Sequence, residues 1–91
     1  MSKTEWDHPK GRQNLRRHGV SFGEASSVFD DPLAVTAPDA AHSDTELRFT
    51  TVGMSNRGWL LVVTTAERRG SIRIISAWRA TKRERHDHEE A

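Results

Sequence analysis

The sequence predicts an α+β domain in which two N-terminal helices pack on one side of a small antiparallel sheet of about four strands, followed by a C-terminal helix. Three observations support this fold class. Two helix-start signals lie close together near the N-terminus, β-branched residues gather in runs between polar turns, and a capping box follows the last run. The 91 residues suffice for one domain, which we expect to span residues 1–91.

A short strand and a helix are expected first. Residues 4–6 form a candidate strand, and Asp7 has the short acidic side chain typical of a helix N-cap. Pro9 falls in the first turn of that helix, where a missing backbone N–H has no cost. We expect the helix to end at about residue 17 or 18, because Gly19 suits the left-handed position that commonly follows a helix.

A second helix is expected to begin directly afterwards. Ser21 and Glu24 have the spacing of a capping box, with Ser21 as N-cap. The apolar face of this helix consists of Phe22, Ala25, Val28 and Phe29. Pro32 predicts the end of the helix, because the residue before a proline avoids the helical conformation.

Four runs rich in β-branched and aromatic residues predict the sheet. They cover residues 33–36, 47–54, 59–66 and 71–78, with a polar loop at 38–44 and turns at 55–58 and 67–70. Alternation along the last run places Arg73, Ile75, Ala77 and Arg79 on one face. Thr81 and Glu84 form a capping box for a charged C-terminal helix, and we expect residues from about 86 to 91 to be frayed.

The charges are distributed unevenly, although the net charge is only +1. Residues 10–17 include four basic and no acidic residues, and residues 68–85 include seven basic residues and one acid. Residues 24–46 include six acids and no lysine or arginine. This separation favours one surface that binds a polyanion, and the alternative is a solvated surface of ion pairs.

Several classes of site and location are excluded. Without cysteine the chain has neither a disulfide framework nor a zinc site built on thiolates. The pair His86 and His88 has no third ligand placed beside it, so we expect no metal and no cofactor. The N-terminus has no apolar leader, and the longest apolar run, residues 59–63, is too short to cross a membrane. We therefore expect a cytoplasmic protein.

The candidates for chemistry lie at the end of the first helix and around the last strand. His18 could transfer a proton near neutral pH, or it could only complement the helix dipole. Arg73 and Arg79, with Arg83 one helical turn further on, could follow a phosphate chain or pair with carboxylates on a neighbouring strand. Glu67 could orient an arginine or accept a proton, or it could be a solvated turn residue.

Tryptophan occurs three times in a chain without tyrosine, at Trp6, Trp59 and Trp78. Each could stack on a base, although packing in the core is the more common use of such a residue.

Six segments in this order resemble the BrnT toxins of bacterial BrnT/BrnA type II toxin–antitoxin systems. They read EWDHPK, NLRRHGVSF, VFDDPL, GMSNRGWLLVV, TAERRGSIRIISAWRAT and KRER, and they cover about residues 5 to 86. The resemblance implies a RelE-like fold and a ribonuclease that halts translation. It also implies a cognate BrnA-like antitoxin of the ribbon-helix-helix class, whose complex with the toxin represses the shared operon.

The positions that match functional residues of this family are His18, Arg57, Glu67, Arg73 and Arg79. Trp78 departs from the pattern, because related sequences often have a basic residue before the arginine, and this would affect RNA affinity or base preference.

The resemblance implies a ribonuclease, and because we expect no metal site, we expect a metal-independent endoribonuclease in which the 2′-hydroxyl of the RNA is the nucleophile. Arg79 would stabilise the charge on the phosphate, with help from Arg73 and Arg83. His18 and Glu67 compete for the acid and base roles. The alternative is a non-catalytic module that binds nucleic acid or a protein partner.

Overall fold

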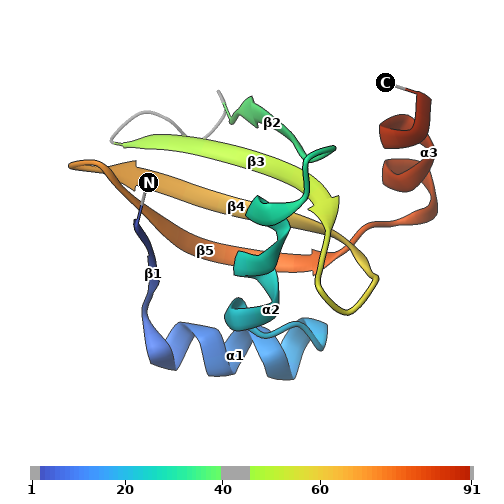
Figure 1. The fold of residues 1–91 in the computed structure, drawn as a ribbon. Helices are drawn as coiled ribbons and strands as arrows, with labels where there is room; N and C mark the ends of the chain where they lie inside the picture. The colour runs from blue at the N-terminus through green and yellow to red at the C-terminus, as the bar shows by residue number, and fades with distance from the viewer. Residues whose placement is uncertain (1–2, 40–45, 91) are drawn as a thin grey trace.

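The computed structural model describes residues 3–39 and 46–90, which form one five-stranded sheet with helices on both sides (Figure 1). The elements in chain order are β1 (Lys3–Trp6), α1 (His8–His18), α2 (Phe22–Ser26), a 3₁₀ helix η1 (Ser27–Asp30), β2 (Val35–Pro38), β3 (Leu47–Met54), β4 (Leu60–Arg68), β5 (Ser71–Arg79) and α3 (Lys82–Glu90). The strand order is β1-β5-β4-β3-β2. Most of the loop expected at 38–44 lies outside the described residues.

The α+β class is confirmed, but the expected antiparallel sheet of about four strands needs correction. The sheet has five strands and is mixed, because β1 pairs in parallel with β5, with Thr4 opposite Ile72. A four-residue strand at the N-terminus has no hairpin partner next to it in the sequence. Only the packing of the whole chain decides which sheet edge it joins.

The strand boundaries differ from the expected ones mainly at the β4–β5 hairpin. β3 has the predicted bounds, whereas β2 begins two residues later than expected and β4 continues to Arg68. The hairpin closes over a turn of only two residues, Arg69 (φ 51°) and Gly70 (φ 79°). Positive φ at both positions is the geometry that matches the twist of the flanking strands, so Glu67 and Arg68 remain in the ladder.

The predicted helix caps are present. Asp7 Oδ2 accepts a hydrogen bond from the backbone N–H of Lys10 (3.0 Å), and Gly19 follows α1 with φ 70°. Ser21 caps α2 through the N–H of Glu24 (3.0 Å). In front of α3 the capping box is complete, because the Thr81 hydroxyl accepts from the N–H of Glu84 and the Glu84 carboxylate accepts from the N–H of Thr81. The α3 helix continues to Glu90, through most of the stretch for which fraying was expected.

The hydrophobic core lies between the sheet and the layer formed by α1, α2 and η1, whereas α3 stands on the opposite side of the sheet (Figure 1). Its buried members are Val20, Phe22, Ala25, Val28, Leu61, Val63, Ile74 and Ala77. At Gly53 in β3 a Cβ atom would lie 2.7 Å from Val28 Cγ1. Glycine is therefore required there, because η1 approaches β3 too closely for any side chain.

A β-bulge in β5 reverses the predicted alternation of its side chains. Thr64 pairs with Ser76 but Thr65 pairs with Ile74, so Ile75 is the extra residue. As a result Ile74 and Ala77 both face the core, although strict alternation had placed them on opposite faces. Residues paired directly across a sheet share a face, so Arg73 and Arg79 leave β5 on opposite faces and not on one.

Asn14 connects α1 to β5 where β1 no longer covers the strand. Its side chain is 7% exposed and makes three hydrogen bonds: Nδ2 donates to the carbonyl oxygens of Val20 (2.9 Å) and Ala77 (2.8 Å), and Oδ1 accepts from the N–H of Ala77 (3.2 Å). A side-chain amide can satisfy both backbone groups of an edge residue at once. This fixes the second half of α1 against the C-terminal half of β5.

Candidate functional site

Arg79 ends β5 and lies on an aromatic ring. Its Cζ atom is 3.8 Å from the ring centroid of Trp59, which precedes β4 and is 43% exposed. The pairing of Arg79 with Leu61 at the start of β4 brings the two side chains together. A guanidinium that stacks on an indole keeps its N–H donors at the edge of the plane available, and the planar contact restricts its rotation.

His18 reaches the same end of β5 from α1. Its ring centroid is 6.4 Å from that of Trp78, the residue before Arg79. The Trp78 indole N–H donates to Glu84 Oε1 (3.4 Å), and the same oxygen caps α3. The last turn of α1, the end of β5 and the start of α3 therefore meet around Trp78.

The turn between β3 and β4 is held in place by a buried carboxylate. The Ser55 hydroxyl donates to Glu24 Oε2 (2.7 Å) and accepts from the N–H groups of Arg57 (3.2 Å) and Trp59 (3.3 Å). Ser55 is 5% and Glu24 9% exposed. This network fixes the backbone of Arg57 and Trp59 relative to α2. Glu24 thus holds the turn, and its side chain does not complete the capping box predicted for it.

Four of the predicted site residues lie at this end of the sheet: His18, Arg57, Arg79 and Arg83. Their side chains are exposed. Among residues 3–39 and 46–90, no carboxylate forms an ion pair with any of the three arginines. Of the two alternatives for Arg79, phosphate binding is therefore favoured over pairing with a carboxylate on a neighbouring strand.

Glu67 and Arg73 lie at the other end, which corrects the expectation that Glu67 shares one site with His18 and Arg79. Glu67 pairs with Ile72 next to the β4–β5 turn, six residues along β4 from the partner of Arg79. At ~3.4 Å per residue the separation is about 20 Å. An antiparallel hairpin must place the residue before its turn at the opposite end from the last residue of the second strand.

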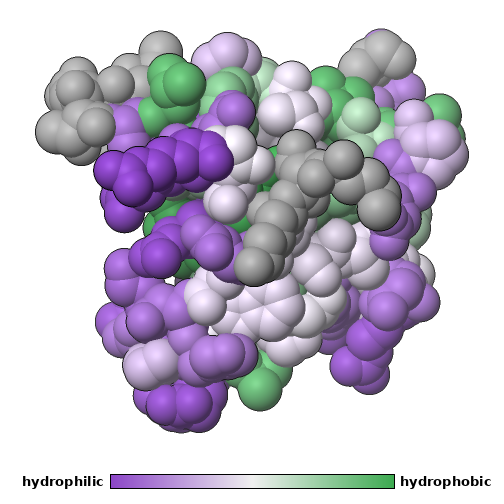
Figure 2. Space-filling model, turned by 60° about the vertical axis from the view of Figure 1, so that its left-hand side comes forward, coloured by the Kyte–Doolittle hydropathy of each residue, from purple (hydrophilic) through white to green (hydrophobic). Residues whose placement is uncertain are grey.

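The arginines at that other end face carboxylates. Arg48 and Arg68 bind Glu46 at 3.1 and 3.2 Å, and Arg73 Nε lies 4.0 Å from Glu5 Oε1. The hydrogen bond from Arg48 lowers the pKa of Glu46, burial opposes this, and the hydrogen bond from Arg68 lowers the pKa further, so that it lies below its ordinary value. In Figure 2, which turns the side of β1 forward, hydrophilic side chains cover much of the surface. This end fits the alternative of a solvated, ion-paired surface.

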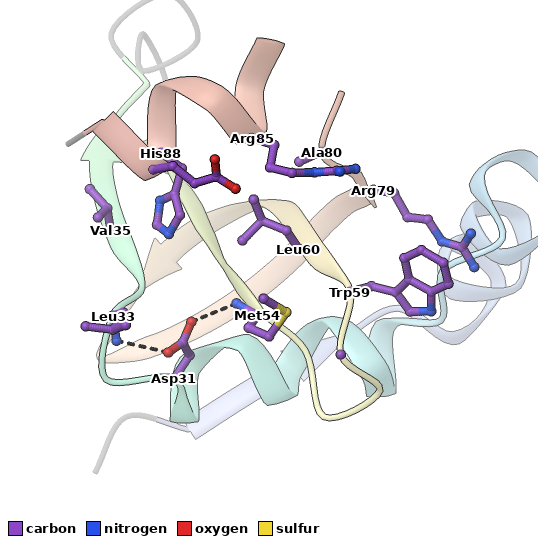
Figure 3. Close-up of a pocket in the computed structure, with 12 residues that line it drawn as sticks. Asp31, Leu33, Val35, Met54, Trp59, Leu60, Arg79, Ala80, Arg85 and His88 are labelled. Atoms are coloured by element: carbon purple, nitrogen blue, oxygen red, sulfur yellow. Dashed lines mark hydrogen bonds between the residues drawn. The ribbon is translucent and has the colours of Figure 1, made fainter. Parts of the chain in front are cut away.

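A groove of about 1040 Å³ lies beside Arg79, between α3 and the ends of β2, β3 and β4 (Figure 3). Its lining includes Asp31, whose Oδ2 accepts from the N–H of Met54 (2.7 Å) and whose Oδ1 accepts from the N–H of Leu33 (3.0 Å). These bonds, that of Met54 first, lower the pKa of Asp31. His18 is not among the lining residues, because it approaches β5 from α1.

Neither a metal cluster nor a membrane-spanning helix is present among the described residues. No group of three or more histidine, aspartate or glutamate side chains in ranges 3–39 and 46–90 could hold a metal ion. In the same part of the chain no helix is long and apolar enough to cross a membrane.

Sequence reasoning missed Asn14, Glu24 and Ser55 as residues that position the site, because each acts through a partner distant in the sequence. Trp59 was considered for base stacking or the core, but its contact with Arg79 needed the structure. The signal available for that contact was that Trp59 begins the predicted strand 59–66 and Arg79 directly follows the predicted strand 71–78, which places both at the same end of an antiparallel pair.

Two of three comparisons with known proteins found a match, and both agree with this fold. The family model described as the ribonuclease toxin BrnT of type II toxin–antitoxin systems matches residues 6–84. The 1.1 Å crystal structure of the Brucella abortus ribonuclease toxin BrnT has a TM-score of 0.69 and 21% identity, covering 90% of this chain and 100% of that one. A search of curated proteins found no match. Because the family model matches most of the sequence, the chain belongs to the BrnT family of ribonuclease toxins of type II toxin–antitoxin systems.

Proposed function

We propose that this chain cleaves RNA at the C-terminal end of β5, without a metal ion, by attack of the RNA's own 2′-hydroxyl on the neighbouring phosphate. The observation that carries the proposal is the pair of side chains at this end: Arg79, which stacks on Trp59 and has no carboxylate partner among residues 3–39 and 46–90, and His18 across Trp78. RNA is the substrate that the family implies.

The proposed step forms the bond from the 2′ oxygen to phosphorus and breaks the bond from phosphorus to the 5′ oxygen. The products are a 2′,3′-cyclic phosphate and a 5′-hydroxyl. Arg79 donates hydrogen bonds to the phosphate oxygens as negative charge develops on them. His18 either accepts the proton of the 2′-hydroxyl or supplies one to the departing 5′ oxygen, and solvent water carries the other of these two protons.

Arg57 and Arg83 flank this centre from the β3–β4 turn and from the first turn of α3. We assign them to phosphates on either side of the scissile one, where they contribute mainly salt-sensitive affinity. Glu67 and Arg73 receive no role at this centre, because the hairpin holds them at its other end.

The family implies an antitoxin partner. We further propose that this partner is BrnA-like, with a ribbon-helix-helix DNA-binding domain, and that the complex represses its own operon. We also propose that the free toxin acts in the cytoplasm and inhibits translation. The resemblance of the sequence to the BrnT/BrnA systems supports the kind of partner, the repression of the operon and the inhibition of translation.

The test is cleavage of an end-labelled RNA by the purified chain in excess chelator. Replacing Arg79 by alanine should slow cleavage by about 10²–10³-fold, and replacing His18 by alanine by about 10²–10⁴-fold. The matched control is Glu67→Gln, which should cleave at the wild-type rate. Product ends should resist ligation until the cyclic phosphate is removed.

Two results would contradict the proposal. One is strict dependence of cleavage on an added divalent ion, and the other is loss of activity in Glu67→Gln with His18→Ala unaffected. Salt-dependent RNA binding without any cleavage would instead support the non-catalytic alternative.

A further inference from the structure

The groove beside Arg79 collects most of the exposed apolar surface of the described chain. Six large hydrophobic side chains of that part are exposed, and four of them line this groove: Leu33 (75%), Val35 (48%), Met54 (45%) and Trp59 (43%). They come from the segment before β2, from β2, from the end of β3 and from the start of β4. A monomeric protein rarely gathers apolar residues in one place in this way unless something binds there.

The groove has an apolar floor between charged walls. Leu33 and Val35 lie at one end and Trp59 with Arg79 at the other, while Leu60 lies on the floor between them (Figure 3). One wall is α3, which has no buried residue and therefore borders the groove without filling it. The volume of about 1040 Å³ is at the upper limit of the ~300–1,000 Å³ that is usual for small-molecule sites.

The charges along the walls favour an acidic occupant. Arg79, Arg85 and His88 line the groove together with two acids, Asp31 and Glu89. Both carboxylate oxygens of Asp31 already accept backbone hydrogen bonds from the chain itself. Among the lining residues, two arginines, Arg79 and Arg85, therefore lie beside one carboxylate without such a bond, Glu89.

We propose that this groove is the docking site for a polypeptide segment of the antitoxin that carries apolar side chains beside acidic ones. The apolar side chains would cover Leu33, Val35 and Met54, and the carboxylates would pair with Arg85 and Arg79. A phosphate chain suits the arginines but not an aliphatic floor, which argues against RNA along the whole groove. The identity of the partner rests on the proposed function, since a type II toxin is expected to bind an antitoxin.

This placement has a functional consequence. Arg79 lines the groove and also belongs to the proposed catalytic centre. A carboxylate paired with Arg79 competes with the scissile phosphate for the same guanidinium. The docked segment would therefore inhibit cleavage without contacting His18.

The test measures the dissociation constant between the full chain and the antitoxin encoded beside it, by calorimetry. Leu33→Glu should weaken binding by about tenfold or more, whereas Leu47→Glu should leave it unchanged. Leu47 is the matched control, since it is the same residue type, is 59% exposed and lies outside the groove. RNA cleavage by free Leu33→Glu should equal that of the wild type.

Two substitutions on α3 that reverse a charge test whether the groove attracts an acidic segment of the antitoxin. Arg85→Glu should weaken binding, and Glu89→Lys should strengthen it, with both differences reduced at high salt. Equal affinity of Leu33→Glu and Leu47→Glu for the antitoxin would overturn the docking site while leaving the ribonuclease proposal intact. Loss of RNA cleavage in folded Leu33→Glu would assign the groove to RNA. If the wild type is a dimer and Leu33→Glu is a monomer, the groove would be assigned to a second copy of this chain.

Discussion

Replacing Asn14 by leucine tests whether one buried amide holds α1 against β5. Leucine has a similar size, so the change removes hydrogen bonds while leaving little empty space. The backbone N–H and C=O of Ala77 and the C=O of Val20 would lose the amide as a partner. β1 pairs with β5 only as far as Ile74, so no neighbouring strand takes its place at Ala77.

The expected loss follows from the number of bonds. A typical hydrogen bond contributes about 1 kcal/mol net, so three of them amount to about 3 kcal/mol of unfolding free energy. For a domain of this size each kcal/mol corresponds to about 4–8 °C, so the melting temperature should fall by about 12–24 °C. Because these bonds also position the C-terminal turn of α1, the folded variant should cleave RNA more slowly.

Equilibrium unfolding in urea, followed by tryptophan fluorescence, measures the difference. The matched control is Gln13→Leu, the neighbouring exposed position on α1, which should change stability by no more than about 0.5 kcal/mol. A loss of less than about 1 kcal/mol in Asn14→Leu would refute the reasoning, because the three bonds could not then be holding the helix.

Three further perturbations concern the sheet, the site and the groove. Gly53→Ala should lower the unfolding free energy, measured in urea, by about 1–3 kcal/mol, because its Cβ would clash with η1. The control Gly23→Ala, whose Cβ would meet only one atom at 3.8 Å, should leave stability unchanged or raise it slightly. Equal effects of the two variants would contradict the close approach of η1 to β3. Trp59→Leu should lower kcat/KM for RNA by about fivefold, which corresponds to the loss of a ~1 kcal/mol cation–π contact to Arg79. Trp59→Phe keeps an aromatic ring and should recover part of this loss. Identical kinetics of both variants and the wild type would mean that the stack has no role in catalysis. The lowered pKa of Asp31 means that its contribution to stability is complete above its ordinary value of 3.8 and is lost as the pH falls through the lower folded-state pKa. The deficit of Asp31→Asn in urea unfolding should therefore shrink as the pH falls below 3.8, and a constant deficit would show that ionisation is not involved.

The sequence by itself determined the features that depend on residues within a few positions of one another. Asp7, Gly19, Ser21 and Thr81 were recognisable as capping residues because a cap is satisfied by backbone groups three or four residues away. The bounds of β3 and the α+β class followed from local alternation and turn composition for the same reason. His18 and the arginines were recognisable as candidates by residue type and were expected to form one site, but that expected site also included Glu67 and Arg73, which the hairpin holds at its other end.

Only the tertiary structure decided how these parts meet. The bulge at Ile75, the parallel pairing of β1 and the three bonds of Asn14 all depend on residues far apart in the chain, which a local pattern does not encode. The same holds for the stack of Arg79 on Trp59 and for the distance of about 20 Å between Glu67 and Arg79. A side chain acquires its partner only when packing against the core sets the register of the strands, and here the register placed His18 and Arg79 at one end of the sheet and Glu67 at the other.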